Sequence, residues 1–560
     1  MSPVRGSSFD KLRTSGVQKR HARETSSGMQ SRGRTTLLLF LFFQALYALT
    51  SSGNAFRVPD EFEIYFQVEH LVDAGDISVP QTLAIRTPAV RDGRTVGSEP
   101  IFFGEIGLDG RPYAPYGPLA AVLALPHHLA ECAIARLAGV RRSPLPGGLA
   151  WVILVGGLTM TATATAAALA VAGFHRAALE LGTPPPAALT LSLLLGGATV
   201  LWPYGTSFYS EAWQAAAFVW AAASLLEARR LSRLADAPSA SRARLLVVLA
   251  ALLLAVAGLT KSTSLIFAPG FVVAALLDRS LPPRTRVETA LALGLGIALA
   301  AGIHVSWNTY RFGRPFDFGY GWGDMIPQLP PRQFLIGDVP RGLVVLLLSP
   351  GKSIVLWAPA LLLAAARAGR FWRHEPGAAL GLACSATVGL LLFAAYLFPE
   401  GGYAHGPRNL VPLVPLLLLP AGGPDSGRWP AAAVAACAAI GVVMAVLSIS
   451  VSFLEDQGGR IGPVSPNVYY RRIDPAPGRS WIQYRLDYVP FVSTMRSPGW
   501  MHAEALGLGP DFFPLHLLQA RRQVPNGAAI PLWLVWALPA TWLLLGASAA
   551  AGLIKSTRPL

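Results

Sequence analysis

Carboxylates gather in one short stretch of this chain. Residues 56–76, FRVPDEFEIYFQVEHLVDAGD, contain six of them, although the whole sequence has 31 acidic against 46 basic side chains. Pro59 suits the first turn of a helix and Gly75 suits a left-handed stop, so the stretch predicts a helix. Asp60 and Glu61 then lie in its first turn, where the helix dipole favours carboxylates. The dipole alone explains them; the alternative is that Asp60 is a catalytic base.

The apolar residues of the same stretch follow a helical period. Phe62, Tyr65, Val68 and Val72 recur at steps of three and four residues. A helix of this kind can lie along a membrane surface. We therefore expect its apolar stripe to face the membrane and its acidic face to point to water.

Lysine is scarce, which draws attention to the two lysines outside the terminal tails. Of five in the chain, only Lys261 in GLTKSTS and Lys352 in SPGKS lie between apolar runs. Such side chains either extend to the membrane interface or hold a phosphate group. Arg408, in EGGYAHGPRNL, is a similar case, and the nearby glycines Gly401 and Gly406 allow close approach of the backbone to a ligand.

Four further residues lie in short motifs of the same kind. Glu211, in LWPYGTSFYSEAW, enters an apolar run, where a carboxylate is usually paired with a cation or functional. His405 could donate a hydrogen bond, although a lone histidine is more often structural. Tyr113 and Tyr116, in LDGRPYAPYGPL, are either interface anchors or a wall that contacts lipid or sugar. The Asp-Gly pair before them predicts a tight hairpin turn.

The composition places the chain in a membrane. It is 560 residues long, 52% hydrophobic and 14% charged, whereas a soluble domain carries about 25% charged residues. The net charge of +15 would suggest nucleic acid for a soluble protein. Here the basic residues lie in tails and short loops between apolar runs, which is typical of cytoplasmic flanks. Cys132, Cys384 and Cys437 lie in apolar stretches and are expected to be packing residues.

About twelve runs, with a range of eleven to thirteen, are expected to span the membrane, because a span needs about 20 apolar residues. A further run, 118–139, contains Pro126, Glu131 and Arg136, and we expect it to lie flat at the surface. The twelve runs are 35–52, 148–174, 186–203, 207–228, 244–259, 262–278, 287–307, 352–366, 377–397, 409–421, 429–450 and 530–553.

Loop charge predicts the orientation of these spans. Arginine-rich loops follow residues 228, 278 and 366, and such loops favour the cytoplasm. Segments 53–117, 308–351, 398–408 and 451–529 then share the outer face, although Arg141 and Arg142 would also lie outside. Four parts are expected: a disordered tail 1–34, in which Met29 is an alternative start; a transmembrane module 35–450; an extracytoplasmic segment 451–529; and a last helix with a short tail, 530–560.

Several chemistries have no motif in this sequence. It shows no phosphate-binding loop, dinucleotide fingerprint, zinc spacing or nucleophile elbow. It also shows no internal repeat that would argue for the inverted halves of a transporter. No cofactor is therefore assigned; a divalent metal is left open, without a ligand set to support it.

The order of the motifs resembles bacterial integral-membrane glycosyltransferases of the GT-C class, in the protein mannosyltransferase and aminoarabinose transferase group. The pieces that carry this resemblance span residues 59 to about 415. They are PDEFEIY, DGRPYAPYGPL, LWPYGTSFYSE, GLTKSTSLIFAPG, NTYRFGRPFDFGY, LLSPGKSIVLWAPALLL and GGYAHGPRNLVPLVP.

The resemblance implies an all-α polytopic membrane protein of the bacterial inner membrane, with a GT-C-like bundle and amphipathic helices in its first outer loop. It implies transfer of a sugar from a polyprenyl phosphate to a glycan, lipid or protein acceptor on the outer face, with inversion. Asp60 matches the family's base, Glu61 stands beside it, and Lys352 stands where the family often has arginine. The alternatives are a membrane transporter or lipid-linked sugar flippase, and a structural membrane partner without activity.

Overall fold

The computed structural model describes most of the chain up to residue 450 and one helix near its end. The described residues are 32–51, 59–84, 86–91, 94–100, 104–139, 157–234, 236–320, 337–396, 399, 401, 404–424, 426, 429–450 and 532–557. Segment 451–529 and almost all of the predicted tail 1–34 lie outside them. The first described helix covers residues 32–49 and so begins inside the expected tail.

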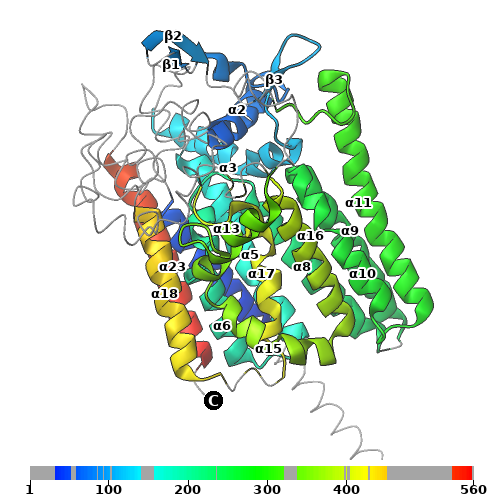
Figure 1. Ribbon diagram of the computed structural model, residues 1–560. Coiled ribbons are helices and arrows are strands. Elements are labelled where there is room, and N and C mark those ends of the chain that lie inside the picture. The colour runs from blue at the N-terminus through cyan, green and yellow to red at the C-terminus, as the bar shows by residue number, and fades with distance from the viewer. Residues whose placement is uncertain are drawn as a thin grey trace, which may run out of the picture.

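Long helices run side by side and form a bundle (Figure 1). Seven helices of the described part are long and apolar enough to cross a membrane. They confirm a helical polytopic membrane protein, but not a count of twelve spans. The seven are α3 (Pro118–Leu137), α5 (Gly157–Glu180), α9 (Ala237–Thr260), α11 (Pro283–Phe312), α16 (Pro376–Ala394), α18 (Ala431–Ser450) and α23 (Leu532–Thr557).

Shorter helices complete the bundle where the sequence interrupts longer runs. Proline removes a backbone donor and clashes with the preceding turn, and it divides the run 408–421 into three pieces, η4, α17 and η5. Helix α8 (Glu211–Ser232) has 22 residues but is not among the seven. The shorter helices are α6 (Pro185–Gly197), α7 (Leu201–Gly205), η3 (Ser262–Ile266), α10 (Pro269–Leu277), α13 (Val339–Leu348), α14 (Ile354–Trp357), α15 (Leu361–His374), η4 (Arg408–Leu413), α17 (Val414–Leu418) and η5 (Leu419–Ala421).

Three of these helices differ from the sequence expectation. The expected run 352–366 is broken at Pro359 into α14 and α15. Helix α13 forms within 308–351, which was expected to be a polar outer loop; Asp338 caps it by accepting a hydrogen bond from Arg341 N at 3.3 Å. Helix α13 is amphipathic, and its 10 residues are too few to span a membrane.

The bundle core lies around α5 and α8, which pack against each other, and α8 also packs against α9. Small residues let the helix backbones approach closely. A Cβ atom added at Gly296 of α11, for example, would lie 2.3 Å from Ala251 O of α9. The outer helices expose large apolar side chains such as Leu295 and Leu544, which is the pattern expected of a lipid-facing surface.

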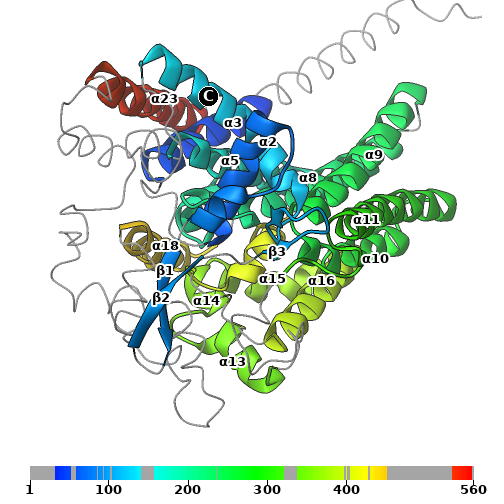
Figure 2. The ribbon, with the colours of Figure 1, turned by 90° about the horizontal axis from the view of Figure 1, so that it is seen from above.

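A second layer covers one end of the bundle. It contains α2 (Pro59–Ala74), η1 (Pro80–Ala84) and two antiparallel hairpins, made by β1 (Arg86–Arg91) with β2 (Arg94–Pro100) and by β3 (Glu105–Ile106) with β4 (Pro112–Tyr113). Seen from above, α2 crosses over the ends of the bundle helices (Figure 2). Its apolar residues form a separate core with those of α3 and with Phe208.

The local predictions for this layer are confirmed, but its expected exposure is wrong. Helix α2 begins at Pro59 and ends before Gly75, whose φ is +74°. Glu61 and Glu63, however, are fully buried, and Val72 of the expected apolar stripe is exposed. These two carboxylates do not point to water, because α3 and the segment before α8 pack against this part of α2, whereas Asp73 near its end is exposed.

Candidate functional site

Four charged residues from four separate elements form one chain of ion pairs. Arg408, at the start of η4, donates from Nε to Glu211 Oε1 at 2.8 Å and from Nη2 to Asp60 Oδ1. Lys261, which ends α9, donates from Nζ to the same Glu211 oxygen at 2.7 Å. The order is therefore Asp60, Arg408, Glu211, Lys261, with alternating charge. We call these four residues the ion-pair chain.

Local structure places each member of the chain. Asp60 lies in the first turn of α2, and Glu211 begins α8, so both carboxylates are at helix N-termini, where the dipole favours them. Lys261 occupies the extended residue between α9 and η3. Arg408 follows Gly406, whose positive φ of +57° turns the backbone into η4.

The ion-pair chain lies in a largely buried setting. The side chain of Glu211 is only 1% exposed, that of Arg408 10% and that of Asp60 18%. The guanidinium of Arg408 also lies over the Tyr209 ring, with Cζ 4.2 Å from the ring centroid. Such a desolvated contact with an aromatic face is favourable for arginine.

Aromatic hydroxyls surround Asp60 and Arg408. Burial, followed by the negative charge of Asp60 and Glu63, raises the pKa of Tyr116 well above its usual value. Burial also raises the pKa of Tyr396 to about 12, with Asp60 adding to the shift and Arg408 opposing it. These tyrosines therefore remain protonated near neutral pH and can donate hydrogen bonds.

Three polar atoms of the ion-pair chain have no partner among the described residues. Glu211 Oε2 is buried and accepts no hydrogen bond there. Arg408 uses Nε and Nη2, whereas Nη1 donates to no atom of the described part. Asp60 uses Oδ1, and its Oδ2 likewise accepts no bond there. The site thus offers one donor and two acceptors to a molecule that enters it.

Lys352 and His405 lie beside the ion-pair chain but outside it. Lys352 Nζ donates to Ala404 O at 2.6 Å, four residues before Arg408. His405 accepts a hydrogen bond at its backbone oxygen from Tyr204 OH at 2.9 Å, and its ring packs against Trp357. Both residues therefore hold the segment that leads into Arg408.

The remaining predicted site residues have contacts of their own. Glu61 Oε1 accepts a hydrogen bond from Phe208 N at 3.1 Å and ties α2 to the segment before α8. Tyr113 OH donates to Asp109 Oδ2 at 2.7 Å within the predicted hairpin. The ring of Tyr113 contacts Trp307 and Phe312 of α11, so the structure does not bring it into the ion-pair chain.

Sequence reasoning missed two residues, one in contact with Arg408 and one that anchors the hairpin layer. Tyr209 lies two positions before Glu211 in the quoted motif, but only its contact with Arg408 distinguishes it from the other tyrosines there. Arg311 is almost fully buried and donates from Nη1 to Ala114 O at 2.8 Å, which anchors the hairpin layer on α11. In the sequence, the position of Arg311 at the end of an apolar run could have marked it as a candidate.

Metal ligands do not gather in this part of the molecule. Within the residues that the structure describes, no three His, Cys, Asp or Glu side chains come together in a way that could hold a metal ion. The described cysteines are free thiols.

Comparison with known proteins shows likeness to solved structures. No protein-family model and no curated protein matches the chain. A crystal structure of ArnT from Cupriavidus metallidurans in the apo state is similar at 16% identity and a TM-score of 0.46, over 93% of this chain and 77% of that chain. The form of ArnT bound to undecaprenyl phosphate gives 16% identity and a TM-score of 0.44, over 92% and 77%.

A second similar protein is AglB from Archaeoglobus fulgidus, an archaeal oligosaccharyltransferase in complex with an inhibitory peptide and a dolichol-phosphate. It has 13% identity and a TM-score of 0.42, over 87% of this chain and 58% of that chain. ArnT is an aminoarabinose transferase. One of the groups that the sequence motifs resemble is thus represented among the similar structures.

Proposed function

We propose that this protein transfers a sugar from a polyprenyl phosphate to an acceptor, by direct displacement with inversion. The observation that carries the proposal is the ion-pair chain, with its unused donor on Arg408 and unused acceptors on Asp60 and Glu211. A sugar joined to a phosphate presents both the anionic oxygens that suit a guanidinium and the hydroxyl groups that suit a carboxylate.

Arg408 is the proposed ligand of the donor phosphate. Its planar fork can bind two phosphate oxygens, and Nη1 is not engaged by the described residues. Lys261 adds positive charge on the other side of Glu211. As the bond between the anomeric carbon and the phosphate oxygen breaks, the phosphate keeps the electron pair, and these cations stabilise the growing charge.

Asp60 is the proposed base. Its Oδ1 is held by Arg408, so the carboxylate has a fixed orientation, and its Oδ2 is left to meet the acceptor hydroxyl. The acceptor oxygen forms the new bond to the anomeric carbon while its proton passes to Asp60. No covalent enzyme intermediate is needed, and a single displacement inverts the anomeric centre.

Glu211 is proposed to hold the sugar. Its buried Oε2 lacks a partner in the described part, and an unpartnered buried carboxylate oxygen is unfavourable. A sugar hydroxyl at this position would satisfy it. The other Glu211 oxygen meanwhile keeps Lys261 and Arg408 together despite their like charges.

The site is proposed to face away from the cytoplasm of a bacterial inner membrane. The opposite end of the bundle carries the arginine-rich turns, including Arg230, Arg279 and Arg370, and such turns favour the cytoplasmic side. Under this orientation residues 53–117 and the segment 451–529 lie outside, and the transmembrane module comprises 35–450.

A donor-cleavage assay tests this function. Purified full-length protein is incubated with a labelled polyprenyl-phosphate sugar and a lipid and glycan extract that supplies acceptors. We expect release of polyprenyl phosphate and appearance of the label in an acceptor, with inverted anomeric configuration. Movement of intact donor across a vesicle membrane without cleavage would instead identify a flippase, and Asp60→Asn protein is the matched control.

A further inference from the structure

A cavity of about 640 Å³ lies at the end of the bundle opposite the ion-pair chain. Parts of α8, α9, α10, α11 and α16 line it. It is separate from the proposed transfer site, and none of the four ion-pair residues contributes to its wall. A ligand of this cavity would therefore be distinct from the donor and the acceptor of the proposed transfer.

The body of this cavity is apolar. Leu225 of α8, Val247 of α9, Phe271 of α10, Ala292 of α11 and Leu382 of α16 all face it. A membrane-embedded cavity with such a wall gives no hydrogen bonds to water, so hydrocarbon is its natural content. The apolar wall therefore suits an acyl chain better than a soluble metabolite.

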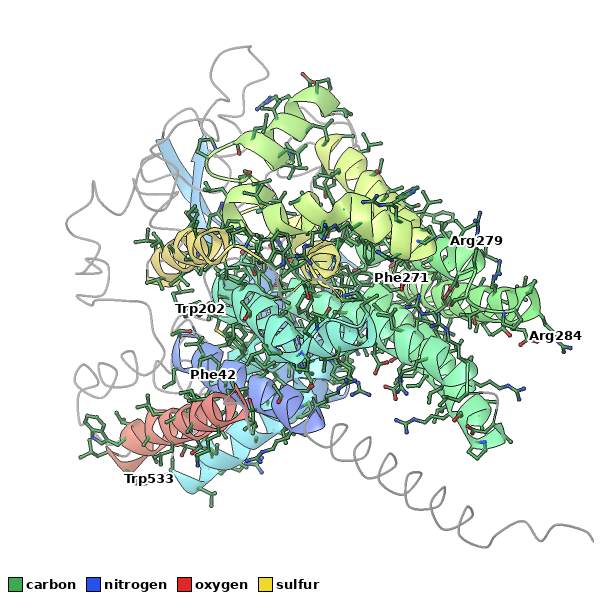
Figure 3. All side chains as sticks on the ribbon, turned by 90° about the horizontal axis from the view of Figure 1, so that it is seen from below. Phe42, Trp202, Phe271, Arg279, Arg284 and Trp533 are labelled. Carbon is green, nitrogen blue, oxygen red and sulfur yellow. The ribbon has the colours of Figure 1, made fainter. Side chains whose placement is uncertain are left out.

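The mouth of the cavity is basic. Arg233, Arg244 and Arg279 line it and are exposed. In the part of the chain that the structure describes, no carboxylate lies within salt-bridge distance of any of the three. In the view from below, Arg279 lies at the edge of the molecule, on the same side as Arg284 of α11 (Figure 3).

The carboxylates that line the same cavity are already paired. Glu375 pairs with Arg229, and Asp278 lies 3.9 Å from the same guanidinium. Glu288 pairs with Arg284 at 2.8 Å. The charges of Arg233, Arg244 and Arg279 are thus not paired with any described carboxylate, and they lie at the mouth of the apolar cavity.

We propose that this cavity binds an anionic phospholipid from the leaflet at this end of the bundle. The phosphate of the headgroup lies among Arg233, Arg244 and Arg279, and an acyl chain enters the apolar body. Basic pockets between membrane helices hold anionic headgroups by this charge complementarity. A zwitterionic lipid fits poorly, because its ammonium group would meet the same arginines.

Native mass spectrometry of the full-length protein in detergent tests the proposal. Phosphatidylglycerol and phosphatidylcholine with identical acyl chains are titrated separately, and bound lipid is counted. We expect phosphatidylglycerol to be retained and phosphatidylcholine to be lost. Replacement of Arg233, Arg244 and Arg279 by alanine should weaken phosphatidylglycerol binding by about tenfold to a hundredfold.

Matched variants distinguish the contribution of the headgroup contacts from that of the acyl-chain contacts. Arg373→Ala removes an exposed arginine of α15 that does not line the cavity and pairs with none of its carboxylates, so it should leave binding unchanged. Ala292→Trp fills the apolar body and should reduce binding of the lipid while the arginines remain. Millimolar inorganic phosphate should not displace the lipid, because it lacks the acyl chain.

Three results would overturn the proposal: equal retention of the two lipids, unchanged binding in both the triple-alanine and Ala292→Trp proteins, or full displacement by inorganic phosphate. If the triple-alanine protein does not fold, as judged by gel filtration, the triple-lysine protein replaces it. That variant keeps the charge and should retain most of the phosphatidylglycerol binding; its loss despite a folded protein would also contradict the proposal.

Discussion

Arg408 Nε lies 2.8 Å from Glu211 Oε1, across 197 positions of the chain. This contact joins η4 to the start of α8, and the second donor of Arg408 extends the link to Asp60 in α2, across 348 positions. The arginine therefore fixes the relative positions of the proposed base, the proposed sugar ligand and the bundle.

Asp60→Asn should lower the rate of sugar transfer by about 10²–10⁴-fold, because an amide cannot accept the proton of the acceptor hydroxyl. The labelled-donor assay measures this rate, and gel filtration checks folding. Asp73→Asn changes an exposed carboxylate on the same helix and should retain normal turnover. Near-normal transfer by the folded Asp60→Asn protein would exclude Asp60 as the base.

Arg408→Ala should severely weaken use of the donor, and Arg408→Lys should recover only part of it, because lysine lacks the planar fork that binds two oxygens. A donor titration of each variant measures the effect. If Arg408→Ala leaves both the donor dependence and the rate unchanged, the phosphate binds elsewhere and Arg408 is only structural.

Glu211→Gln should lower the free energy of unfolding by about 3–5 kcal/mol, because it leaves the buried charges of Lys261 and Arg408 without their shared partner. Thermal unfolding in detergent measures the change. Glu288→Gln breaks an exposed ion pair with Arg284 and is the control, with no measurable loss expected. Equal stability of the Glu211→Gln and wild-type proteins would show that the ion-pair chain contributes little to folding.

Lys352→Met should weaken donor use about tenfold to a hundredfold, since it removes a charged hydrogen bond to Ala404 O and loosens the segment before Arg408. Lys352→Arg should be mild, because it keeps a charged donor at this position. The donor titration distinguishes the two variants. Identical behaviour of the methionine and wild-type proteins would remove Lys352 from the positioning of Arg408.

Impermeant thiol labelling in intact cells should mark a cysteine at Leu108 and spare one at Arg284, after Cys132, Cys384 and Cys437 have been replaced. Both positions are exposed, and they lie at opposite ends of the bundle. The arginine-rich turns favour the cytoplasmic side for the Arg284 end. Labelling of the Arg284 position alone would reverse the orientation.

Local sequence signals determined several elements of this protein correctly. Pro59 and Gly75 bound helix α2, and the Asp109–Gly110 pair lies in the turn between β3 and β4. These features depend on backbone preferences of the residues themselves, so a short window contains the information. Apolar runs likewise located most of the long helices, because membrane burial requires a continuous apolar segment. The exception is α3, which covers the run expected to lie flat and is long and apolar enough to cross a membrane.

The same sequence window could not predict what covers an element. The acidic face of α2 was expected to point to water, yet Glu61 and Glu63 are buried, because Phe208 and α3 lie over them. Periodicity reports which residues share a face of a helix. It carries no information about which distant segment packs on that face.

Four charged residues could be recognised as unusual from the chain alone, because each lies beside an apolar run: Asp60, Glu211, Lys261 and Arg408. Their assembly into one ion-pair chain, and the position of Tyr113 in the hairpin layer instead, follow from the packing of the helices. An ion pair forms only within about 4 Å in space. Residues hundreds of positions apart reach that distance only when the packing of the whole bundle brings their elements together.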